Sequence, residues 1–447
     1  MNNSQNVKIS FLIYIFSLIL FLFQIQNPQT HNFDEFHYVP AAKEFLEGKT
    51  TRNWEHPPLP KYFIALGIKA FGDEPLGWRV GSAVAGSLTL VAVFQLGVFF
   101  WGSLSPALFC VLITLLNQMI VVQSRIGMLD PYMVAFMLWG IFFGLKSGKN
   151  KFHIYLSGVF FGLAIASKWI ALLAPLTFLF LNFKGKIKNK FILLTVMSGA
   201  YVLVFIPLFM MDGFKFSFAE FIPYQWSMWK SQTSQMAAHG YQSVWYQWIM
   251  LIRPMWFSYE SIENKFVRGV LLIGNPLIMW SGLVGILYVF FDFLRKKSEL
   301  NKFILIFYTV FAFCWIGIPR SVSFYYYYYP ASFLLSFALT SLFYDERQKK
   351  VQWGVLCFGG FLFLQDYGLH LSNRNLVIYI LLALTFSVFF GLYGLRIEKL
   401  KSVSSTPLRI VYLVLVTLIF ISFFPLLMGI KFPSASFQKL MWFTSWI

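Results

Sequence analysis

The sequence is poor in charge. Charged residues make up 12% of the 447 residues, and hydrophobic residues make up 58%. Soluble domains carry roughly 25% charged residues, so this balance excludes a soluble enzyme and predicts a chain that lies mostly in a lipid bilayer. The formal charge is +18 at pH 7, but the basic residues sit in short stretches between apolar runs. That arrangement favours membrane topology over nucleic-acid binding.

Cysteine is equally scarce. The three cysteines, Cys110, Cys314 and Cys357, all lie inside apolar runs. We therefore expect buried neutral thiols and no disulfide framework. The sequence also lacks an internal repeat, a low-complexity tail and a soluble domain. The first apolar run, residues 11–23, is followed by no small-residue cleavage site, which predicts a retained first helix.

Apolar runs of bilayer length predict an all-α polytopic membrane protein. We expect thirteen spans, and eleven or twelve remain alternatives because two short neighbouring runs meet at Ser167-Lys168. The expected spans are 9–25, 79–100, 104–122, 128–146, 152–167, 169–183, 190–211, 270–292, 302–318, 323–343, 351–366, 375–395 and 408–429.

The distribution of charge predicts the orientation in the membrane. With the N-terminus inside, the cytoplasmic connections are short and rich in Lys or Arg, whereas the acidic residues gather mainly on the opposite side. This pattern supports an odd number of spans in a plasma-membrane protein, with the C-terminus outside.

Two expected external segments are long enough to build a site. Residues 26–78 hold two amphipathic stretches, near 35–46 and 59–71, which we expect to form helices at the membrane surface. The second external segment is crowded with Trp and Tyr, typical of a membrane-interface belt or of a binding groove. The expected modules are an N-terminal module, 1–211, an aromatic external segment, 212–269, and a C-terminal module, 270–447.

Asp34 and Glu35 are the first candidates for chemistry. Adjacent carboxylates at a helix start point in different directions, so one can act as a general base while the other orients a neighbour. The structural alternative is helix capping, because Asp is a favoured N-cap residue and acid stabilises a first helical turn.

A second element is the run Glu55-His56-Pro57-Pro58. The residue before a proline is restricted to extended geometry, which suits a fixed contact from His56 to a phosphate or an acceptor. With the two carboxylates, His37 and His56 could bind a divalent metal. Their spacing matches no tight ligand motif, however, and we expect no metal.

The third element is a set of cations at the expected external face. Its members are Arg125, Lys168, Arg253, Arg320 and Arg374. Charged groups at membrane depth are costly unless paired, and a cluster of them suits a lipid phosphate. Snorkelling to anionic headgroups is the alternative, but it accounts less easily for Arg125 and Lys168.

In their order and spacing, these pieces resemble the protein O-mannosyltransferases. The matching motifs are Phe33-Asp34-Glu35-Phe36-His37, His56-Pro57-Pro58-Leu59, residues 125–130 and residues 162–169. Later pieces are similar too, namely residues 241–259, Gly274-Asn275-Pro276 and residues 320–330 with their tyrosine run. The resemblance covers nearly the whole chain.

The resemblance implies an integral-membrane glycosyltransferase of the GT-C type. Such an enzyme moves mannose, with inversion, from a polyprenyl monophosphate to a Ser or Thr hydroxyl of a protein on the non-cytoplasmic side. It implies no metal or other cofactor, because a monophosphate leaves without a diphosphate to neutralise. By motif position, Asp34 would be the base and Glu35 would help to place a substrate. The implied substrate-binding residues are His37, Glu55, His56, Arg125, Asp130, Lys168, Arg253, Arg320 and Tyr325.

The sequence departs from the family pattern in three places. The second external segment is too short for the β-trefoil domain of eukaryotic members, which implies a prokaryotic form. Glu55 stands where many members have Asp, and the tyrosine run lacks a histidine often seen there. The aminoarabinose transferases, which act on lipid A, and a polytopic transporter remain alternatives, although a transporter tends to show paired repeats. Some family members dimerise, and the resemblance therefore keeps a dimer among the expected partners.

Overall fold

The computed structural model describes residues 3–49, 53–148, 150–181, 187–211, 217–234, 239–318, 320–367 and 404–447. The chain folds as two compact units made of interleaved segments. The first unit comprises Met1–Phe99, Ile120–His239 and Phe313–Val322, and the second comprises Phe100–Met119, Gly240–Ala312 and Ser323–Ile447. The three modules expected from the sequence remain a prediction.

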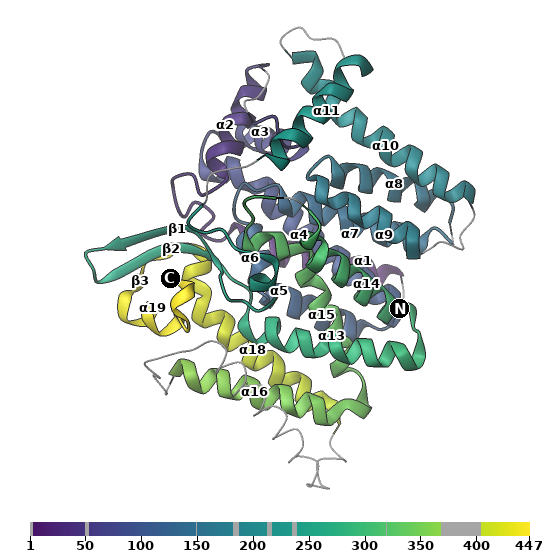
Figure 1. The fold of residues 1–447 in the computed structure, drawn as a ribbon. Helices are drawn as coiled ribbons and strands as arrows, with labels where there is room; N and C mark the ends of the chain where they lie inside the picture. Colours follow the sequence, from purple (N-terminus) through teal and green to yellow (C-terminus); the bar gives the residue numbers. More distant parts are fainter. Residues whose placement is uncertain are drawn as a thin grey trace. The chain divides into compact units, whose positions relative to one another are not determined.

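The first unit is helical in its described residues (Figure 1). Its elements, some of which end a few residues beyond the unit, are α1 (Asn3–Leu22), α2 (Glu35–Leu46), α3 (Leu59–Phe71), α4 (Pro75–Trp101), α6 (Met119–Gln123), α7 (Asp130–Lys146), α8 (Phe152–Ile165), η1 (Trp169–Leu172), α9 (Leu173–Leu181), α10 (Ile187–Met210), α11 (Phe218–Thr233) and η3 (Cys314–Ile316).

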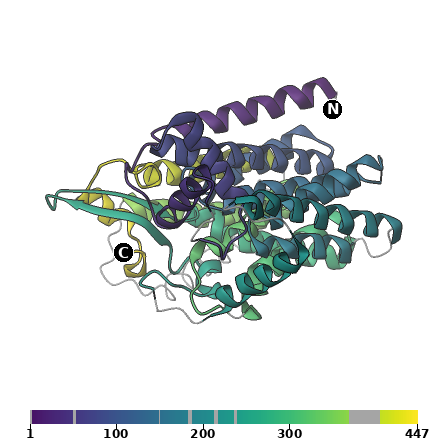
Figure 2. The ribbon, with the colours of Figure 1, turned by 90° about the horizontal axis from the view of Figure 1, so that it is seen from above.

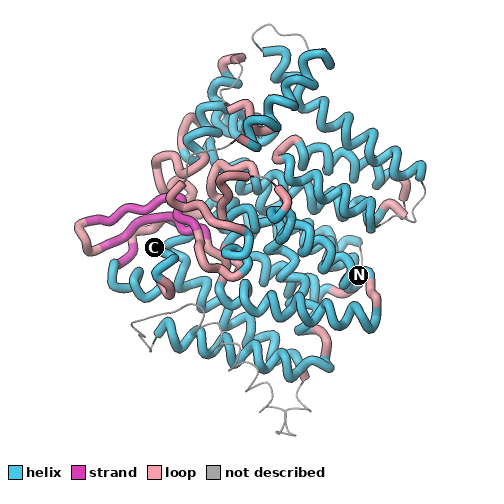
Figure 3. The backbone as a smooth tube through the Cα atoms, viewed as in Figure 1, coloured by secondary structure: helices cyan, strands magenta, loops and turns pink. Residues whose placement is uncertain are grey.

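The second unit combines helices with three strands (Figure 3). Its elements are α5 (Leu104–Leu116), α12 (Trp245–Ile249), β1 (Met255–Ile262), β2 (Phe266–Leu272), α13 (Pro276–Lys296), α14 (Glu299–Phe313), η4 (Tyr325–Tyr328), α15 (Tyr329–Phe343), η5 (Glu346–Gln348), α16 (Lys349–Tyr367), α18 (Ser405–Met428), β3 (Phe432–Pro433), α19 (Ser434–Leu440) and η7 (Thr444–Trp446).

Six helices in the described part of the chain are long and apolar enough to cross a membrane. They are Ser4–Leu22, Pro75–Trp101, Ile187–Met210, Pro276–Lys296, Glu299–Ile316 and Ser405–Met428. Three shorter helices, Leu104–Leu116, Phe152–Ile165 and Trp169–Leu181, are also apolar. Each expected span in this part of the chain coincides largely with helix, and the expected span 375–395 lies outside the described residues. The prediction of a helical polytopic membrane protein is confirmed.

A small antiparallel sheet was not expected. Its strand order is β1-β2-β3, and the β1–β2 hairpin extends as two long arrows in Figures 1 and 2. The expected span 270–292 therefore begins too early, because its first residues complete β2. The helix starts at Pro276, after Asn275, whose side chain accepts a hydrogen bond from the Leu277 N–H. Proline at the first position sets the helical φ and has no N–H to leave unpaired.

The two amphipathic helices expected in residues 26–78 are confirmed as α2 and α3. An aromatic core holds α11 against α2 and α10, and its buried members are Phe45, Phe205, Leu208, Phe209, Phe221 and Met228. Trp54 and Trp169 pack against the same core. The core thus places α11 beside residues 53–56 and the start of η1.

In the first unit, α8 packs against both α7 and α10, as Figure 1 also shows. Gly158 and Gly162 let α8 approach α10 closely. A Cβ atom at Gly158 would lie 2.8 Å from Cβ of Val196, and one at Gly162 would lie 2.5 Å from the backbone oxygen of Met197. Small residues four apart are a common means of close helix packing in membranes.

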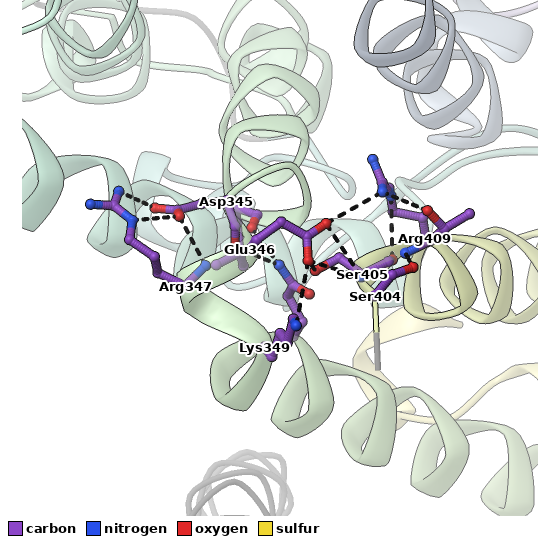
Figure 4. Close-up of polar contacts among 10 residues, drawn as sticks. Asp345, Glu346, Arg347, Lys349, Ser404, Ser405 and Arg409 are labelled. Atoms are coloured by element: carbon purple, nitrogen blue, oxygen red, sulfur yellow. Dashed lines mark hydrogen bonds and ion pairs between the residues drawn. The ribbon is translucent and has the colours of Figure 1, made fainter. Parts of the chain in front are cut away.

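Polar side chains join the start of α18 to the connection between α15 and α16 (Figure 4). Glu346 accepts hydrogen bonds from the backbone N–H and the hydroxyl of Ser405, at 3.1 and 2.9 Å. Arg409 lies 3.6 Å from the same carboxylate. These contacts connect the segment that precedes residues 368–403 to the segment that follows them.

Candidate active site

The acidic loop after α1 is anchored by a buried ion pair. The Arg79 guanidinium, at the start of α4, donates to both carboxylate oxygens of Glu35, at 2.7 and 2.8 Å. Neither side chain is exposed. Arg79 also donates to three backbone oxygens of the loop, those of Ile25, Pro28 and Thr30. This arginine therefore organises the whole loop that precedes α2.

Glu35 also ties the loop to residues 125–130. Its carboxylate accepts the backbone N–H of Gly127 at 2.7 Å and that of Asn32 at 2.8 Å. Both carboxylate oxygens are thus engaged inside the protein. Sequence reasoning grouped Glu35 with the catalytic residues, whereas its burial and contacts favour a positioning role.

Arg125 contacts the end of the first helix. Its guanidinium donates to the backbone oxygens of Phe21 and Gln24, each at 2.8 Å, and also to that of Phe23. The side chain is 3% exposed. The last carbonyl groups of a helix have no intrahelical partner, and a cation satisfies them well. This arrangement favours a helix cap over the phosphate contact expected for Arg125.

Asp34 occupies the N-cap position of α2, but its side chain makes no capping hydrogen bond. The carboxylate is half-buried and accepts a hydrogen bond from the Tyr38 hydroxyl at 3.1 Å. Burial raises the pKa of Asp34 to about 6, against the lowering effect of the Lys168 charge and of the Tyr38 hydrogen bond. A carboxyl group with this pKa can accept a proton near neutral pH.

Lys168 and Asp130 form a second buried ion pair. The Lys168 ammonium lies 2.9 Å from each oxygen of Asp130, at the start of α7. Charge on both residues acts on the pKa of Asp34, so the pair lies close to that carboxyl group. The structure therefore brings together two expected site residues, Asp130 of residues 125–130 and Lys168 of residues 162–169, close to Asp34.

The turn at residues 53–56 lies against the segment that carries Lys168. The backbone N–H of Leu59 donates to the oxygen of Ala166 at 3.3 Å. Burial holds the pKa of His56 well below its ordinary value, and the charges on Lys168 and Arg320 lower it further. The His56 ring is 6.1 Å from that of Tyr38, centroid to centroid. His56 is therefore a neutral group beside the Asp34–Tyr38 pair.

Gln232 links His56 to Arg320. Its amide nitrogen is 2.6 Å from the backbone oxygen of Glu55 and 3.3 Å from Nδ1 of His56. Its amide oxygen accepts from the Arg320 guanidinium at 3.0 Å. Arg320 was expected to contact the lipid phosphate, and it lies in the same cluster as His56.

His37 and Glu55 lie at the edge of the cluster. His37 is exposed, and its charge acts on the pKa of both Asp34 and His56. The Glu55 carboxylate accepts a hydrogen bond from the Asn53 amide at 2.7 Å. Both residues are close enough to the cluster to influence a bound substrate, and their roles remain predictions.

Arg253 and Tyr325 belong to the second unit. Arg253 donates to the backbone oxygen of Gly240 at 2.6 Å. The buried Tyr325 hydroxyl accepts the Gly274 N–H at 3.0 Å, which joins the tyrosine run to the segment before α13. The substrate contacts expected for these two residues remain predictions. Arg374 lies outside the described residues.

Sequence reasoning missed Arg79, Lys61 and Gln232. Arg79 stands at the first residue of an expected span, where a charge needs a partner, and that signal could have identified it. Lys61 lies three residues after Pro58, but its burial could not be foreseen from an amphipathic pattern. Gln232 comes from a distant aromatic segment, and no local signal marks it.

The cluster contains carboxylates and histidines, the side chains that ligate metals. Among the residues that the structure describes, no three His, Cys, Asp or Glu side chains group closely enough to hold a metal ion. Metal-independent activity remains a prediction.

Two family models match the chain. One is described as "Dolichyl-phosphate-mannose-protein mannosyltransferase" and matches residues 55–210. The other is described as "C-terminal four TMM region of protein-O-mannosyltransferase" and matches residues 216–446. Together they span most of the sequence and include the His56, Lys168, Gln232 and Arg320 positions.

Curated relatives carry related names. The polyprenol-phosphate-mannose–protein mannosyltransferase of Corynebacterium glutamicum is 24% identical over 513 residues, covering 93% of this chain and 88% of the relative. The protein of that name from Mycolicibacterium smegmatis is 28% identical over 178 residues, covering 33% of this chain and 34% of the relative. An undecaprenyl phosphate-α-4-amino-4-deoxy-L-arabinose arabinosyl transferase of Pseudomonas aeruginosa is 28% identical over 142 residues, 29% of this chain and 26% of the relative.

Solved structures share the fold. The protein O-mannosyltransferase Pmt1-Pmt2 complex of S. cerevisiae, bound to the sugar donor, matches with a TM-score of 0.71 at 13% identity, covering 100% of this chain and 93% of the other. ArnT from Cupriavidus metallidurans, bound to undecaprenyl phosphate, matches with a TM-score of 0.60 at 16% identity, covering 95% and 76%. The fold is that of the GT-C glycosyltransferases, as expected, and by its family models the chain belongs to the protein O-mannosyltransferase family.

Proposed function

We propose that this protein transfers mannose from polyprenyl-phosphate-mannose to Ser or Thr hydroxyl groups of proteins. The observation that carries the proposal is the cluster around Asp34, in which a carboxyl group titrating near pH 6 lies close to Lys168. Lys168 and Arg320 are in turn the cations that act on His56, and Arg320 is hydrogen-bonded to Gln232. A base next to cations is what an inverting sugar transfer from a phosphate needs. Membership of the family supplies the substrate class.

In the proposed reaction, Asp34 accepts the proton of the acceptor hydroxyl. The hydroxyl oxygen forms a bond to the anomeric carbon of mannose while the bond from that carbon to the phosphate oxygen breaks. The electron pair of the broken bond leaves with polyprenyl phosphate. Because the incoming and outgoing oxygens lie on opposite sides of the anomeric carbon, the configuration inverts.

The departing phosphate gains negative charge, which needs cations. Arg320 and Lys168 are the two cations whose charges act on His56 most strongly. We assign the phosphate to this side of the cluster, with Arg320 as its main contact, because a guanidinium donates along two directions at once. Lys168 contributes charge while it holds Asp130.

The proposed setting is a plasma-membrane protein with its N-terminus in the cytoplasm and the Asp34 cluster on the extracytoplasmic face. The excess of Lys and Arg in the connections expected on the cytoplasmic side supports this orientation. A pairing with a second subunit is also proposed, since the solved Pmt1-Pmt2 structure is a complex.

The test is a transfer assay with purified protein in lipid, radiolabelled polyprenyl-phosphate-mannose and a Ser/Thr-rich peptide. We expect label on the peptide with wild-type protein and none with Asp34→Asn. Consumption of a polyprenyl-phosphate sugar only when a lipid A acceptor is offered would move the function to the second candidate, a lipid glycosyltransferase. That candidate is favoured by the similarity to the arabinosyl transferase and to ArnT.

A further inference from the structure

Lys61 is a fully buried lysine next to the candidate active site. It lies in the first turn of α3 with no exposed surface. Its ammonium donates to the backbone and side-chain oxygens of Asn53, the latter at 3.2 Å, and to the backbone oxygen of His56 at 3.0 Å. All three acceptors belong to the turn at residues 53–56.

Burying an ammonium group is costly unless its donors are satisfied. Here the ammonium donates to oxygens of one short turn and so closes it. The Asn53 side chain donates to the Glu55 carboxylate at 2.7 Å, so a hydrogen bond within the turn also stabilises it. Lys61 therefore restricts the backbone of His56, the residue whose ring belongs to the cluster.

Gln232 restricts the His56 ring from the other side. Arginine can only donate hydrogen bonds, so the atom of Gln232 that meets Arg320 has to be the amide oxygen. The amide nitrogen is then the atom that faces the Glu55 oxygen and Nδ1 of His56. An amide nitrogen can only donate, so Nδ1 accepts and the ring proton sits on Nε2.

We propose that Lys61 and Gln232 are positioning residues that hold His56 as a neutral imidazole with its proton on Nε2. In this form His56 is a hydrogen-bond donor toward the substrate, and its target is an oxygen of the lipid-linked phosphate beside Arg320. The assignment of the phosphate as the target depends on the proposed function. The assignment of the His56 tautomer depends only on contacts within the protein.

The tautomer is measured on resting protein, without any donor substrate. Nitrogen-15 NMR of protein labelled at its histidines distinguishes the two neutral tautomers, and His56→Gln identifies the His56 signals. We expect the Nε2–H form in the wild type. Gln232→Glu keeps the shape but offers Nδ1 no donor, so we expect the proton of His56 to move to Nδ1.

The matched control is Gln225→Glu in the same helix. The Gln225 oxygen accepts from the Tyr201 hydroxyl at 2.6 Å, a contact that a carboxylate keeps. We expect no change in the His56 signals of this variant. Retention of the Nε2–H form in Gln232→Glu, or the same change in both variants, would overturn the proposal.

Lys61 is tested by Lys61→Met beside Lys69→Met, which changes an exposed lysine of the same helix. Loss of a nearby positive charge should raise the pH at which His56 protonates in Lys61→Met, with no change in Lys69→Met. If Lys61→Met does not fold, Asn53→Ala removes one acceptor of the ammonium and should broaden the His56 signals. Sharp, unshifted His56 signals in both variants would remove Lys61 from the proposal.

Activity then tests the role of the donor. In the mannose transfer assay, Gln232→Glu should lower kcat roughly 100-fold, because the lost hydrogen bond is aimed at charge that develops in the transition state. Unchanged kcat together with the altered tautomer would overturn the role in catalysis. Absence of transfer in the wild type, with the tautomer change intact, would instead count against the proposed function alone.

Discussion

Glu35 and Arg79 form a two-point ion pair, at 2.7 and 2.8 Å, in which neither side chain has exposed surface. The same arginine holds the backbone of the loop before α2. A buried ion pair contributes little when compared with a well-packed apolar pair, but losing one partner leaves an uncompensated charge. The pair therefore makes the shape of the Asp34 loop depend on one residue in α4.

Arg79→Met is expected to lower the free energy of unfolding by about 3–5 kcal/mol, because the Glu35 carboxylate stays buried without a partner. Thermal unfolding in detergent measures the change. Lys49→Met is the control, since Lys49 and Glu47 form an exposed pair, with 63% and 56% exposed side chains. Such exposed pairs contribute about 0–1 kcal/mol to stability. An equal decrease in the free energy of unfolding in the two variants would contradict the anchoring role of Arg79.

Asp34→Asn is expected to abolish transfer while donor binding is retained, because the change removes a base but little volume. In the wild type, kcat/KM should rise with pH through about 6, as the Asp34 carboxyl group loses its proton. Transfer assays from pH 5 to 8 measure the profile, and a rate independent of pH across about 6 would remove Asp34 as the base.

The same pKa predicts a pH dependence of stability. The pKa of Asp34 is raised from its ordinary value of 3.8, so the stability that this group contributes in acid is lost as the pH rises through about 6. Asp34→Asn should therefore be at least as stable as the wild type at pH 7.5, and the advantage should vanish below about pH 4. A Tm of Asp34→Asn below that of the wild type at pH 7.5 would contradict the raised pKa of Asp34.

We expect Arg125 to have a structural role and Arg320 to have a role in substrate binding. Arg125→Leu should lower the free energy of unfolding by about 2 kcal/mol or more, because three carbonyl groups at the end of α1 lose a charged donor. Arg320→Leu should raise the donor KM roughly tenfold or more and change the Tm less. The reverse result would restore Arg125 as the phosphate contact.

Close packing of α8 and α10 predicts opposite effects for two similar changes. Gly162→Ala should destabilise the protein, since the added Cβ would lie 2.5 Å from the backbone oxygen of Met197. Gly199→Ala, in α10, meets no atom within 4 Å and should be neutral or stabilising by about 0.5–1 kcal/mol. Thermal unfolding of both variants tests this prediction. A decrease in stability in Gly199→Ala as large as that in Gly162→Ala would contradict the packing argument.

Chelation should leave transfer unchanged. The leaving group is a monophosphate, and the proposed cluster supplies its own cations in Arg320 and Lys168. The measurement is the transfer rate before and after treatment with EDTA. Loss of activity that one divalent cation restores would show that a metal takes part.

Local pattern was sufficient to predict α2 and α3, because amphipathic spacing and the Pro-Pro start are properties of a few adjacent residues. The same holds for most spans, which depend on length and hydropathy alone. The hairpin was missed for a related reason. The apolar residues of β2 run directly into those of α13, and a hydropathy pattern shows no boundary between them.

The roles of individual polar and charged residues could not be predicted from their motifs. Glu35, Arg125 and Tyr325 all stand in motifs that resemble the family, yet each is occupied by contacts with distant backbone or side-chain groups. Whether a polar group faces a substrate or a partner depends on which segments meet it in space. That information is spread over the chain and is not contained in the motif itself.

The long reach of the Arg125 cap has a consequence for the biogenesis of the protein. Its partners at the end of α1 precede it by 101 to 104 residues, and Gly127 follows Glu35 by 92. At about 5–20 residues per second, a ribosome needs roughly 5–20 s to synthesise that stretch. During this interval the acidic loop has to wait at the membrane surface without its permanent neighbours. The loop that carries Asp34 therefore reaches its final contacts only after α4 and residues 125–127 have been synthesised.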